Sequence, residues 1–346
     1  MSVRIGLGPV TGQVPPGSGR SVADEYAEIL GLARLAEACG FDSFWVSEHH
    51  GAADGYLPSL LVMLGAVAAV THRLGLGTAV ALGPFQHPLR FAEDCAVVDQ
   101  LARGRLQVGL GAGWRREEFA SFGIPTDERI GRTAELVRIC RSAWAGGRFT
   151  FRGRYFSYDD VAVTPTPFGR IPLLLAGNVP AAAERAGRSG DGYLATPHDR
   201  IADFRRQIAL FDRAARDAGR DPARLKIGFH VNAWVSPDGA LPARVRDALW
   251  HGIGTYQLWH ARDAGGAATA LPPLDEALIR ARTIAGTPAE VVVALRPWIE
   301  EFGGRELEVI VRLHHPGLRL AEVEPAVRAF GAEVIPALRG LAPVTA

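Results

Sequence analysis

The sequence predicts an α/β protein folded as a single (β/α)8 TIM barrel with insertions, with residues 1–346 forming one domain. Short apolar runs alternate with helical patterns almost from the first residue, and parallel strands need such helical crossovers. Eight strand-like runs occur, whereas a doubly wound sheet more often has roughly five to seven strands. The length also suits one domain, because such barrels run from about 250 to 400 residues.

The eight expected strands are short runs of apolar residues. They span residues 3–7, 43–47, 74–81, 105–110, 171–176, 192–195, 225–233 and 307–313. Each run is followed by a helical pattern or by an insertion, as a barrel requires.

The expected helices show apolar residues at helical spacing and end at breaker residues. Residues 24–39 carry Ile29, Leu32 and Ala36 on one face, and Gly40 stops the helix. Further helices are expected at 58–70, 88–102, 132–144, 180–187, 201–218 and 321–339.

Two insertions interrupt this alternation, at about 145–170 and 236–306. Alternating aromatic residues in 149–158, with Gly153 between them, predict a hairpin or an excursion from the barrel. The stretch 236–306 is expected to be irregular, because it contains Pro272–Pro273 and a Gly/Ala-rich segment at 264–268.

The charge balance and the apolar runs exclude two classes of partner. Lys and Arg number 38 against 37 Asp and Glu, so the net charge of +1 argues against a nucleic-acid surface. The longest apolar run, Leu60–Val70, is too short for the ~20 residues that span a bilayer, and the N-terminus has no apolar signal core. We expect a soluble, cytoplasmic protein with no membrane partner.

Lys226 is the only lysine, which removes several reaction classes. A P-loop, a pyridoxal enzyme and a Schiff-base aldolase each need a lysine in the site. Lys226 is expected at the beginning of a strand, at the end of the barrel that supports stability. The cysteines, Cys39, Cys95 and Cys140, lie far apart in helix-like stretches and predict buried residues, neither a disulfide framework nor a metal site.

Active sites of such barrels lie at the carboxyl ends of the strands. The second strand ends in Glu48, His49 and His50. Alternation places Glu48 and His50 on one side and His49 on the other, so one shared metal ion is not expected. A histidine that is catalytic or faces a cofactor is favoured, and a structural histidine paired with Glu48 is the alternative.

Small residues mark three further strand ends. Gly77–Pro84 allows either tight helix packing or a flat ring against the backbone. In Gly109–Trp114 the tryptophan stands where a dinucleotide motif needs glycine, so a Rossmann site is disfavoured. After the fifth strand, Gly177 and Asn178 open a helix whose N–H groups would hold an anion, unless Asn178 is an ordinary N-cap.

Two more clusters carry polar groups. His314 and His315 end the last strand and are candidates for the substrate pocket. Arg115 and Arg116, followed by Glu117 and Glu118, are expected to form a solvated helix face.

Four segments together resemble the bacterial luciferase-like monooxygenases. They are Gly40–His50, Leu76–Val80, His87–Asp94 and Asp99–Gly109. The resemblance is dense over residues 40–125 and thinner towards the closing helix. It implies a (β/α)8 barrel that binds reduced FMN or, in a large branch of the family, the deazaflavin coenzyme F420 at the carboxyl-end mouth.

The resemblance also implies roles for particular residues. His49 would lie at the reactive face, with Glu48 setting its orientation and charge, and a non-proline cis peptide within Thr78, Ala79 and Val80 would lie against the ring. The remaining cofactor-binding residues would be Gly111, Ala112, Gly113 and Trp114 along the ring and Gly177 and Asn178 at the phosphate. Because Ala112 replaces the arginine of luciferase itself, a luciferase-type phosphate clamp and light emission are not implied.

The leading hypothesis is a monooxygenase that uses reduced FMN, supplied by a partner flavin reductase, and dioxygen to oxygenate a small organic substrate. The first alternative is hydride transfer with coenzyme F420, and the second is a non-catalytic flavin-binding paralogue. The resemblance further suggests a homodimer through helices of the N-terminal half, to which Leu60–Val70 could contribute.

Overall fold

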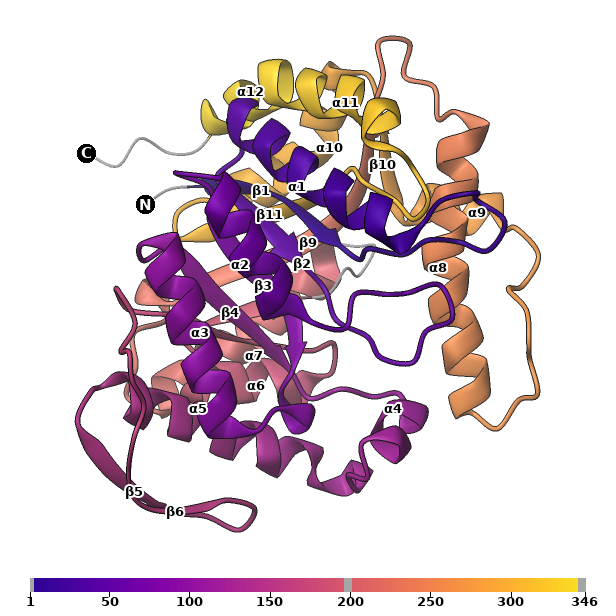
Figure 1. The fold of residues 1–346 in the computed structure, drawn as a ribbon. Helices are drawn as coiled ribbons and strands as arrows, with labels where there is room; N and C mark the ends of the chain where they lie inside the picture. The colour runs from indigo at the N-terminus through magenta and orange to yellow at the C-terminus, as the bar shows by residue number, and fades with distance from the viewer. Residues whose placement is uncertain (1–2, 196–200, 342–346) are drawn as a thin grey trace.

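The computed structural model describes residues 3–195 and 201–341, and these form a closed parallel barrel (Figure 1). Its eight strands are paired in the order β1-β2-β3-β4-β7-β8-β9-β11, and β11 pairs back with β1. The strands are β1 Val3–Val10, β2 Ser43–Val46, β3 Gly75–Leu82, β4 Leu106–Gly111, β7 Leu173–Ala176, β8 Gly192–Ala195, β9 Lys226–Val235 and β11 Leu307–Arg312. The predicted fold and all eight predicted strands are confirmed.

Helices surround the barrel. They are α1 Val22–Ala38, α2 Leu60–Val70, α3 Pro88–Ala102, α4 Arg116–Ser121, α5 Arg129–Trp144, α6 Pro180–Ser189, α7 Ile201–Asp217, α8 Ala243–Asp263, α9 Glu276–Ala281, α10 Pro288–Phe302, α11 Leu320–Ala329 and α12 Ile335–Arg339. The closing helix, predicted as one piece, is divided by a π-helical turn at Phe330–Val334. No helix within the described ranges is long and apolar enough to cross a membrane.

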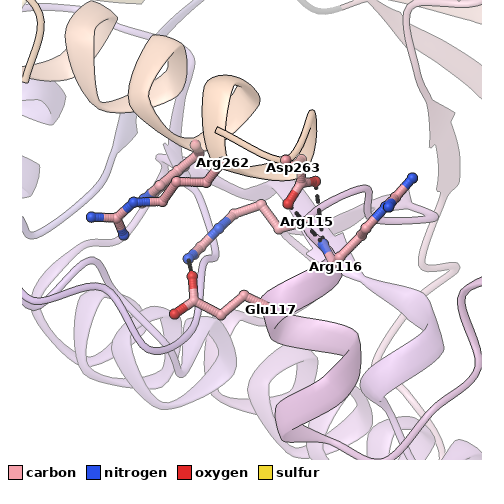
Figure 2. A pocket seen from close by; sticks show the side chains of 7 residues that line it. Arg115, Arg116, Glu117, Arg262 and Asp263 are labelled. Atoms are coloured by element: carbon pink, nitrogen blue, oxygen red, sulfur yellow. Dashed lines mark hydrogen bonds and ion pairs between the residues drawn. The ribbon is translucent and has the colours of Figure 1, made fainter. Parts of the chain in front are cut away.

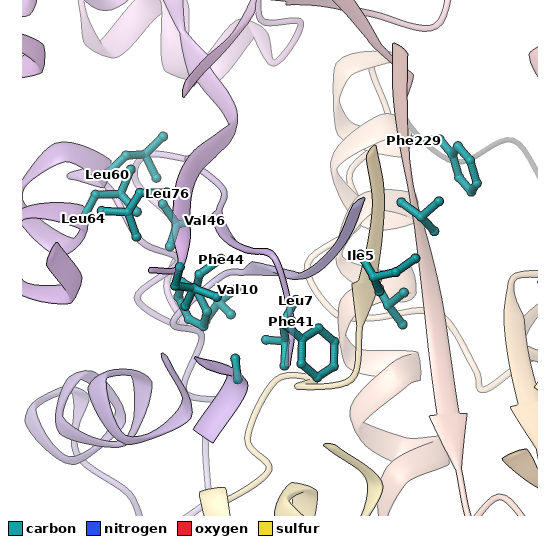
Figure 3. Packing of buried hydrophobic residues seen from close by; sticks show 14 of the residues in the cluster. Ile5, Leu7, Val10, Phe41, Phe44, Val46, Leu60, Leu64, Leu76 and Phe229 are labelled. Carbon is teal, nitrogen blue, oxygen red and sulfur yellow. The ribbon is translucent and has the colours of Figure 1, made fainter. Parts of the chain in front are cut away.

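The larger core lies between the outer faces of the strands and the helices. Alternate strand residues such as Ile5, Leu7, Phe44 and Val46 are fully buried there. Figure 3 shows these side chains with Leu60 and Leu64 of α2, so the helix pattern and the strand pattern of the sequence meet in one core.

A smaller core fills the barrel itself. It consists of Trp45, Ala79, Leu174, Leu194 and Ile310. The indole of Trp45 occupies so much space that a Cβ added at Gly6 or Gly77 would overlap it, and the glycines of these strands therefore make room for one large side chain.

Below Trp45, at the amino ends of the strands, lies a buried charged cluster. The ammonium of Lys226 contacts Glu308 at 2.9 Å and the side-chain oxygen of Gln107 at 2.7 Å. Glu308 also accepts a hydrogen bond from Ser43 and pairs with Arg4. Lys226 is thus a structural residue at the end of the barrel opposite the strand carboxyl ends, as predicted.

The first insertion contains the predicted hairpin, and it projects away from the barrel at lower left in Figure 1. Its strands are β5 Arg148–Arg152 and β6 Ser157–Ala162.

The expectation that 236–306 is irregular was wrong, because this stretch contains α8, α9, β10 (Thr283–Gly286) and α10. β10 pairs with the carboxyl-terminal half of β9, starting at the Asn232 position where β11 ends. The helix α10 begins with a capping box between Thr287 and Glu290, with Pro288 at its first position. The sequence therefore carried a start signal for α10 that the composition of the stretch concealed.

Candidate active site

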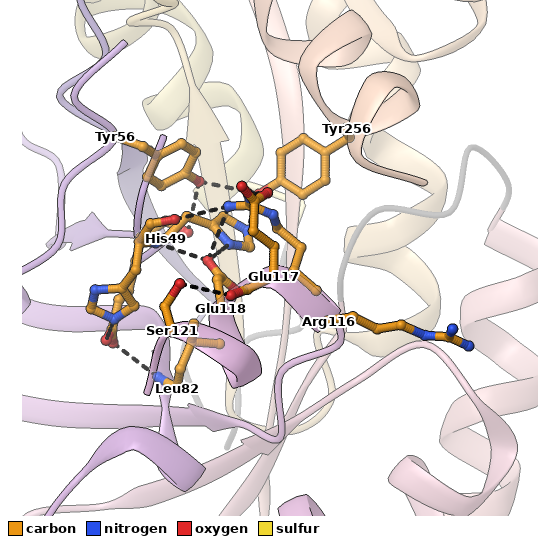
Figure 4. Close-up of polar contacts among 12 residues, drawn as sticks. His49, Tyr56, Leu82, Arg116, Glu117, Glu118, Ser121 and Tyr256 are labelled. Atoms are coloured by element: carbon orange, nitrogen blue, oxygen red, sulfur yellow. Dashed lines mark hydrogen bonds and ion pairs between the residues drawn. The ribbon is translucent and has the colours of Figure 1, made fainter. Parts of the chain in front are cut away.

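His49 is the centre of a polar cluster at the carboxyl ends of the strands (Figure 4). Its Nδ1 lies 2.8 Å from a carboxylate oxygen of Glu118 on α4, and its Nε2 lies 3.2 Å from the hydroxyl of Tyr256 on α8. The Tyr256 hydroxyl lies 3.1 Å from that of Tyr56, which in turn lies 3.1 Å from the Ser47 hydroxyl. The imidazole is therefore held from both sides, and a chain of hydroxyl groups extends from it.

Glu118 is an ionised carboxylate although it is buried. Burial raises its pKa, but hydrogen bonds from the side chain of His49 and the backbone N–H of His50, with the charge of Arg115, hold the pKa below its usual value. A carboxylate only accepts hydrogen bonds, so Nδ1 of His49 carries the proton. In the neutral imidazole, Nε2 is then the acceptor and faces the Tyr256 hydroxyl.

The prediction that residues 115–118 form a solvated face was wrong for two of them. Arg115 is only 2% exposed and Glu118 is also buried. The Arg115 guanidinium donates to the His50 carbonyl at 3.0 Å and pairs with Glu117 and Glu118 at 2.8 and 3.2 Å. These residues are buried because they pack under α8, a contact that the local spacing of charges does not report.

Glu48 does not contact His49, and the predicted orientation of His49 by Glu48 was wrong. One oxygen of Glu48 lies 2.6 Å from Nε2 of His50, and the other accepts the backbone N–H of Leu82 at 2.9 Å. The His50 ring packs edge-on against Phe85 and Phe122. β2 ends at Val46, so these residues lie in the loop after the strand. Glu48 nevertheless pairs with His50 and not with His49, as the predicted alternation implied.

A small apolar surface lies at the same end of the barrel. The peptide bond between Ala79 and Val80 is a non-proline cis bond, as the resemblance implied. Val80 is the one partly exposed residue of β3, and with Ala176 it packs on the interior core beneath. A Cβ at Gly111 would lie 2.6 Å from Val80, so only glycine leaves this surface open beside β4. Thr78 is fully buried, and its hydroxyl donates to the Gly109 carbonyl at 2.8 Å, which ties β3 to β4.

The strand-four loop borders this surface. Gly113 has a φ of +69°, which favours glycine, and Ala112, Gly113 and Trp114 are partly exposed. The Trp114 ring stacks on His260 of α8 at 4.0 Å between centroids, so the loop packs directly against α8.

The loop after β7 is fixed by hydrogen bonds to two of its backbone carbonyls. Tyr193 donates to the Gly177 carbonyl at 2.6 Å and Gln207 donates to the Asn178 carbonyl at 3.1 Å. The N-cap of α6 is Val179, with no side-chain hydrogen bond. The alternative that Asn178 caps this helix was therefore wrong, and the first N–H groups of α6 have no side-chain acceptor at the cap.

Residues of α8 complete the cluster, and none of them was predicted from the sequence. Tyr256, Trp259 and His260 share one face of the helix because they are spaced three and four residues apart. Trp259 lies 4.7 Å from the His49 ring and 4.0 Å from the Arg115 guanidinium carbon. Aromatic residues at helical spacing were the available signal.

The helix α8 covers the His49 cluster and is called the lid below. A cavity of about 320 Å³ lies where the carboxyl end of this helix meets the start of α4 (Figure 2). It is lined by Arg115, Arg116, Glu117, Trp259, Arg262, Asp263 and Gly265. The backbone N–H of Arg116 donates to the Asp263 carboxylate, so this edge joins the start of α4 to the end of α8.

His314 and His315 are buried, and each uses a ring nitrogen on the backbone. Nε2 of His314 lies 3.1 Å from the Leu318 carbonyl, and Nε2 of His315 lies 3.3 Å from the Ala233 carbonyl. Burial lowers the pKa of His314 to about 4 and that of His315 as well. Both are therefore neutral near pH 7. Among the described residues, no three His, Cys, Asp or Glu side chains form a metal site.

Two relatives of known type show which proteins this chain resembles. The chain is 30% identical over 329 residues to F420-dependent glucose-6-phosphate dehydrogenase 1 of Rhodococcus jostii (strain RHA1), which covers 91% of this chain and 95% of the relative. It is 33% identical over 209 residues to the FMNH(2)-dependent dimethylsulfone monooxygenase of Pseudomonas fluorescens (strain Pf0-1), with 59% and 56% covered. By their names, these relatives use two different cofactors.

The solved structure of the monooxygenase RslO1 from Streptomyces bottropensis matches with a TM-score of 0.79 and 28% identity, over 97% of this chain and 99% of that one. Residues 4–306 match the model of the luciferase-like monooxygenase family. The matching segment contains seven of the eight barrel strands and every residue of the His49 cluster. This chain therefore belongs to the luciferase-like monooxygenase family.

Proposed function

We propose that this chain is a monooxygenase that binds reduced FMN above the barrel and oxygenates a small organic substrate with dioxygen. The observation that carries the proposal is the position of His49. A carboxylate-oriented imidazole lies at the same end of the barrel as the apolar surface of Val80 and Ala176, under the aromatic lid of α8. Such a covered site excludes water from a reactive centre.

The residues at the mouth fit a flavin. Val80 and Ala176 offer an apolar floor that a ring can cover, and Gly111 leaves room beside it. The start of α6, next to Gly177 and Asn178, has no side-chain acceptor at its cap and would bind the FMN phosphate there. When bound, reduced FMN would supply the electrons that activate dioxygen.

The chain's own groups would then handle the protons. His49 would donate or accept a proton at Nε2, while the Glu118 carboxylate holds Nδ1–H and stabilises the positive imidazolium. The Tyr256 hydroxyl would position Nε2, and its contact with the Tyr56 hydroxyl would hold it in place. Trp259 and Trp114 would keep water from the site. A separate flavin reductase would supply the reduced FMN.

The second candidate is hydride transfer with coenzyme F420, and one observation favours it. The relative that aligns over 95% of its length is an F420-dependent dehydrogenase. His49 would act there on a substrate hydroxyl. The only lysine lies at the opposite end of the barrel, so a sugar phosphate at the mouth would have to be bound by arginine side chains or by backbone N–H groups.

Anaerobic titration of the purified protein with reduced FMN and with reduced coenzyme F420 tests the proposal, with cofactor fluorescence as the readout. We expect reduced FMN to bind more tightly and the FMN complex to consume dioxygen. Tight binding of coenzyme F420 with none of reduced FMN would favour the second candidate. His49→Ala should lose dioxygen consumption coupled to substrate, whereas the control His72→Ala, at an exposed site, should not.

We also propose that the active form is a homodimer. Val62 on α2 and Val97 and Leu101 on α3 are exposed apolar side chains, and α2 packs beside α3. An apolar patch of this kind marks a surface that a partner covers, and the family resemblance points to a second copy of the chain.

A further inference from the structure

Arg312 is a buried cation at the mouth of the barrel, and the mechanism above does not use it. Inward-facing residues of β11 alternate, so Glu308, Ile310 and Arg312 share the inner side. Glu308 belongs to the charged cluster at the amino end, and Ile310 to the apolar core around Trp45. Arg312 follows at the carboxyl end, in the layer of the candidate active site.

The guanidinium of Arg312 has only neutral partners. It donates to the Thr11 hydroxyl at 2.9 Å and to the His314 carbonyl at 3.4 Å. No carboxylate of residues 3–195 or 201–341 forms an ion pair with it. Arg312 is nevertheless only 9% exposed, and isolated buried charges are costly unless they are paired.

Other buried arginines of this chain show the usual solution. Arg20 pairs with Glu25 and Glu28 at 2.8 and 2.7 Å. Arg115 pairs with Glu117 and Glu118. Arginine stays protonated in proteins. Arg312 is therefore a buried charge without the carboxylate partner that Arg20 and Arg115 have.

The groups around Arg312 do not compensate its charge. Burial and the charge of Arg312 lower the pKa of His230 to about 3, and His314 and His315 are also neutral. Tyr56 and Tyr256 lie near enough for the charge of Arg312 to oppose the rise in pKa that burial causes in both phenols. The charge therefore acts on the Tyr256 hydroxyl that contacts His49 and on the Tyr56 hydroxyl next to it.

Gly252 of α8 faces the guanidinium. A Cβ at this position would already be in van der Waals contact with Nη1, at 3.7 Å, so only glycine leaves this side of Nη1 uncovered by the helix. From this unpaired charge, its neutral hydrogen-bond partners and the glycine that faces it, we infer that Arg312 is a specificity-determining residue that binds an anionic oxygen of the substrate, a carboxylate or a phenolate. The inference rests on the proposed function in that it places the substrate of that same site between Arg312 and His49.

The test measures binding of benzoate and its neutral isostere benzamide to the cofactor-free protein by calorimetry. We expect the wild type to prefer benzoate, and Arg312→Gln to bind benzoate roughly 10- to 100-fold more weakly, the range for a lost charge-assisted hydrogen bond. Arg312→Lys keeps the charge and should keep part of the preference. Equal binding of benzoate and benzamide to the wild type, or undiminished benzoate binding to Arg312→Gln, overturns the inference.

Thermal unfolding of the same proteins supplies a second readout. Removing an unpaired buried charge should leave the melting temperature of Arg312→Gln equal to or above that of the wild type, as at other functional sites that sacrifice stability. The control Arg20→Gln removes a paired charge and should melt lower. A fall in Arg312→Gln as large as that in Arg20→Gln would overturn the inference. Because neither readout uses a flavin, failure here is distinguishable from failure of the cofactor titration.

Discussion

The guanidinium carbon of Arg115 lies 4.0 Å from the centre of the Trp259 indole ring. The same guanidinium donates to the His50 carbonyl and pairs with Glu118, the carboxylate that holds His49. One side chain thus connects the lid helix α8 to the residue proposed for proton transfer. A shift of α8 would therefore move the His49 imidazole through the contacts of Arg115 with the His50 carbonyl and with Glu118.

Replacing Trp259 by leucine should loosen α8 and leave the barrel intact. A cation–π contact is worth about 0.5–2 kcal/mol, so amide hydrogen exchange in residues 243–263 should become roughly 2- to 30-fold faster. Trp298→Leu is the matched control, because Trp298 stacks on Phe229 away from the site. Equal exchange of α8 in both variants would contradict the anchoring role.

Replacing Glu118 by glutamine should slow turnover roughly 100-fold or more without weakening flavin binding. The amide oxygen can still accept the His49 Nδ1–H, but it cannot stabilise an imidazolium. The measurement compares substrate-dependent dioxygen consumption with the dissociation constant of reduced FMN. Glu117→Gln, at an exposed neighbour, serves as the control, and wild-type turnover in Glu118→Gln would remove this carboxylate from the mechanism.

Glu25 should make the fold less stable as the pH rises. Burial raises its pKa to about 7, against the opposing charge of Arg20, from a usual value of 4.5. Between these values the folded protein keeps a proton that the unfolded chain releases, so the free energy of unfolding falls as pH increases, by roughly 3 kcal/mol at most.

Urea unfolding at pH 5 and pH 8 checks this sign. Glu25→Gln cannot ionise, so its stability should fall less between the two pH values than that of the wild type. His314, 3.7 Å from Glu25, has a pKa lowered to about 4 and contributes equally to both proteins. An identical fall in the two proteins would show that Glu25 is ionised at both pH values.

Val62→Asp should convert the expected homodimer to a monomer. Val62 on α2 is 77% exposed, and a carboxylate there would be buried unpaired in a symmetric interface. Val293→Asp on α10, where the valine is 63% exposed, is the control and should stay dimeric. Light scattering after size exclusion gives the mass, and a monomeric wild type would reject the proposal.

The barrel strands and the main strand-end motif were predictable from the sequence, for a physical reason. Buried parallel strands are continuous apolar runs, and polar residues at their carboxyl ends have few uses other than function. His49 therefore stood out directly after the run 43–47. The cis bond at Ala79–Val80 was reached through the family resemblance and is confirmed.

The partners of His49 were not predictable in the same way. Tyr256 is 207 residues away in the chain, and nothing local marks it. The spacing of Arg115 and Glu118 is the same for a solvated helix face and for a buried pair, so only the packing under α8 distinguishes them. The composition signals that predicted an irregular stretch, Pro272–Pro273 and the Gly/Ala-rich segment 264–268, lie after α8, so they do not describe the helix itself.

The interior of the barrel has an evolutionary consequence. Trp45 occupies the volume that side chains at positions 6 and 77 would need. In relatives of this chain, these three positions should vary together, with a smaller residue at 45 accompanied by larger ones at 6 and 77. Sequence covariation at these positions would thus report the volume beneath the apolar surface of Val80 and Ala176, independently of any substrate that a relative uses.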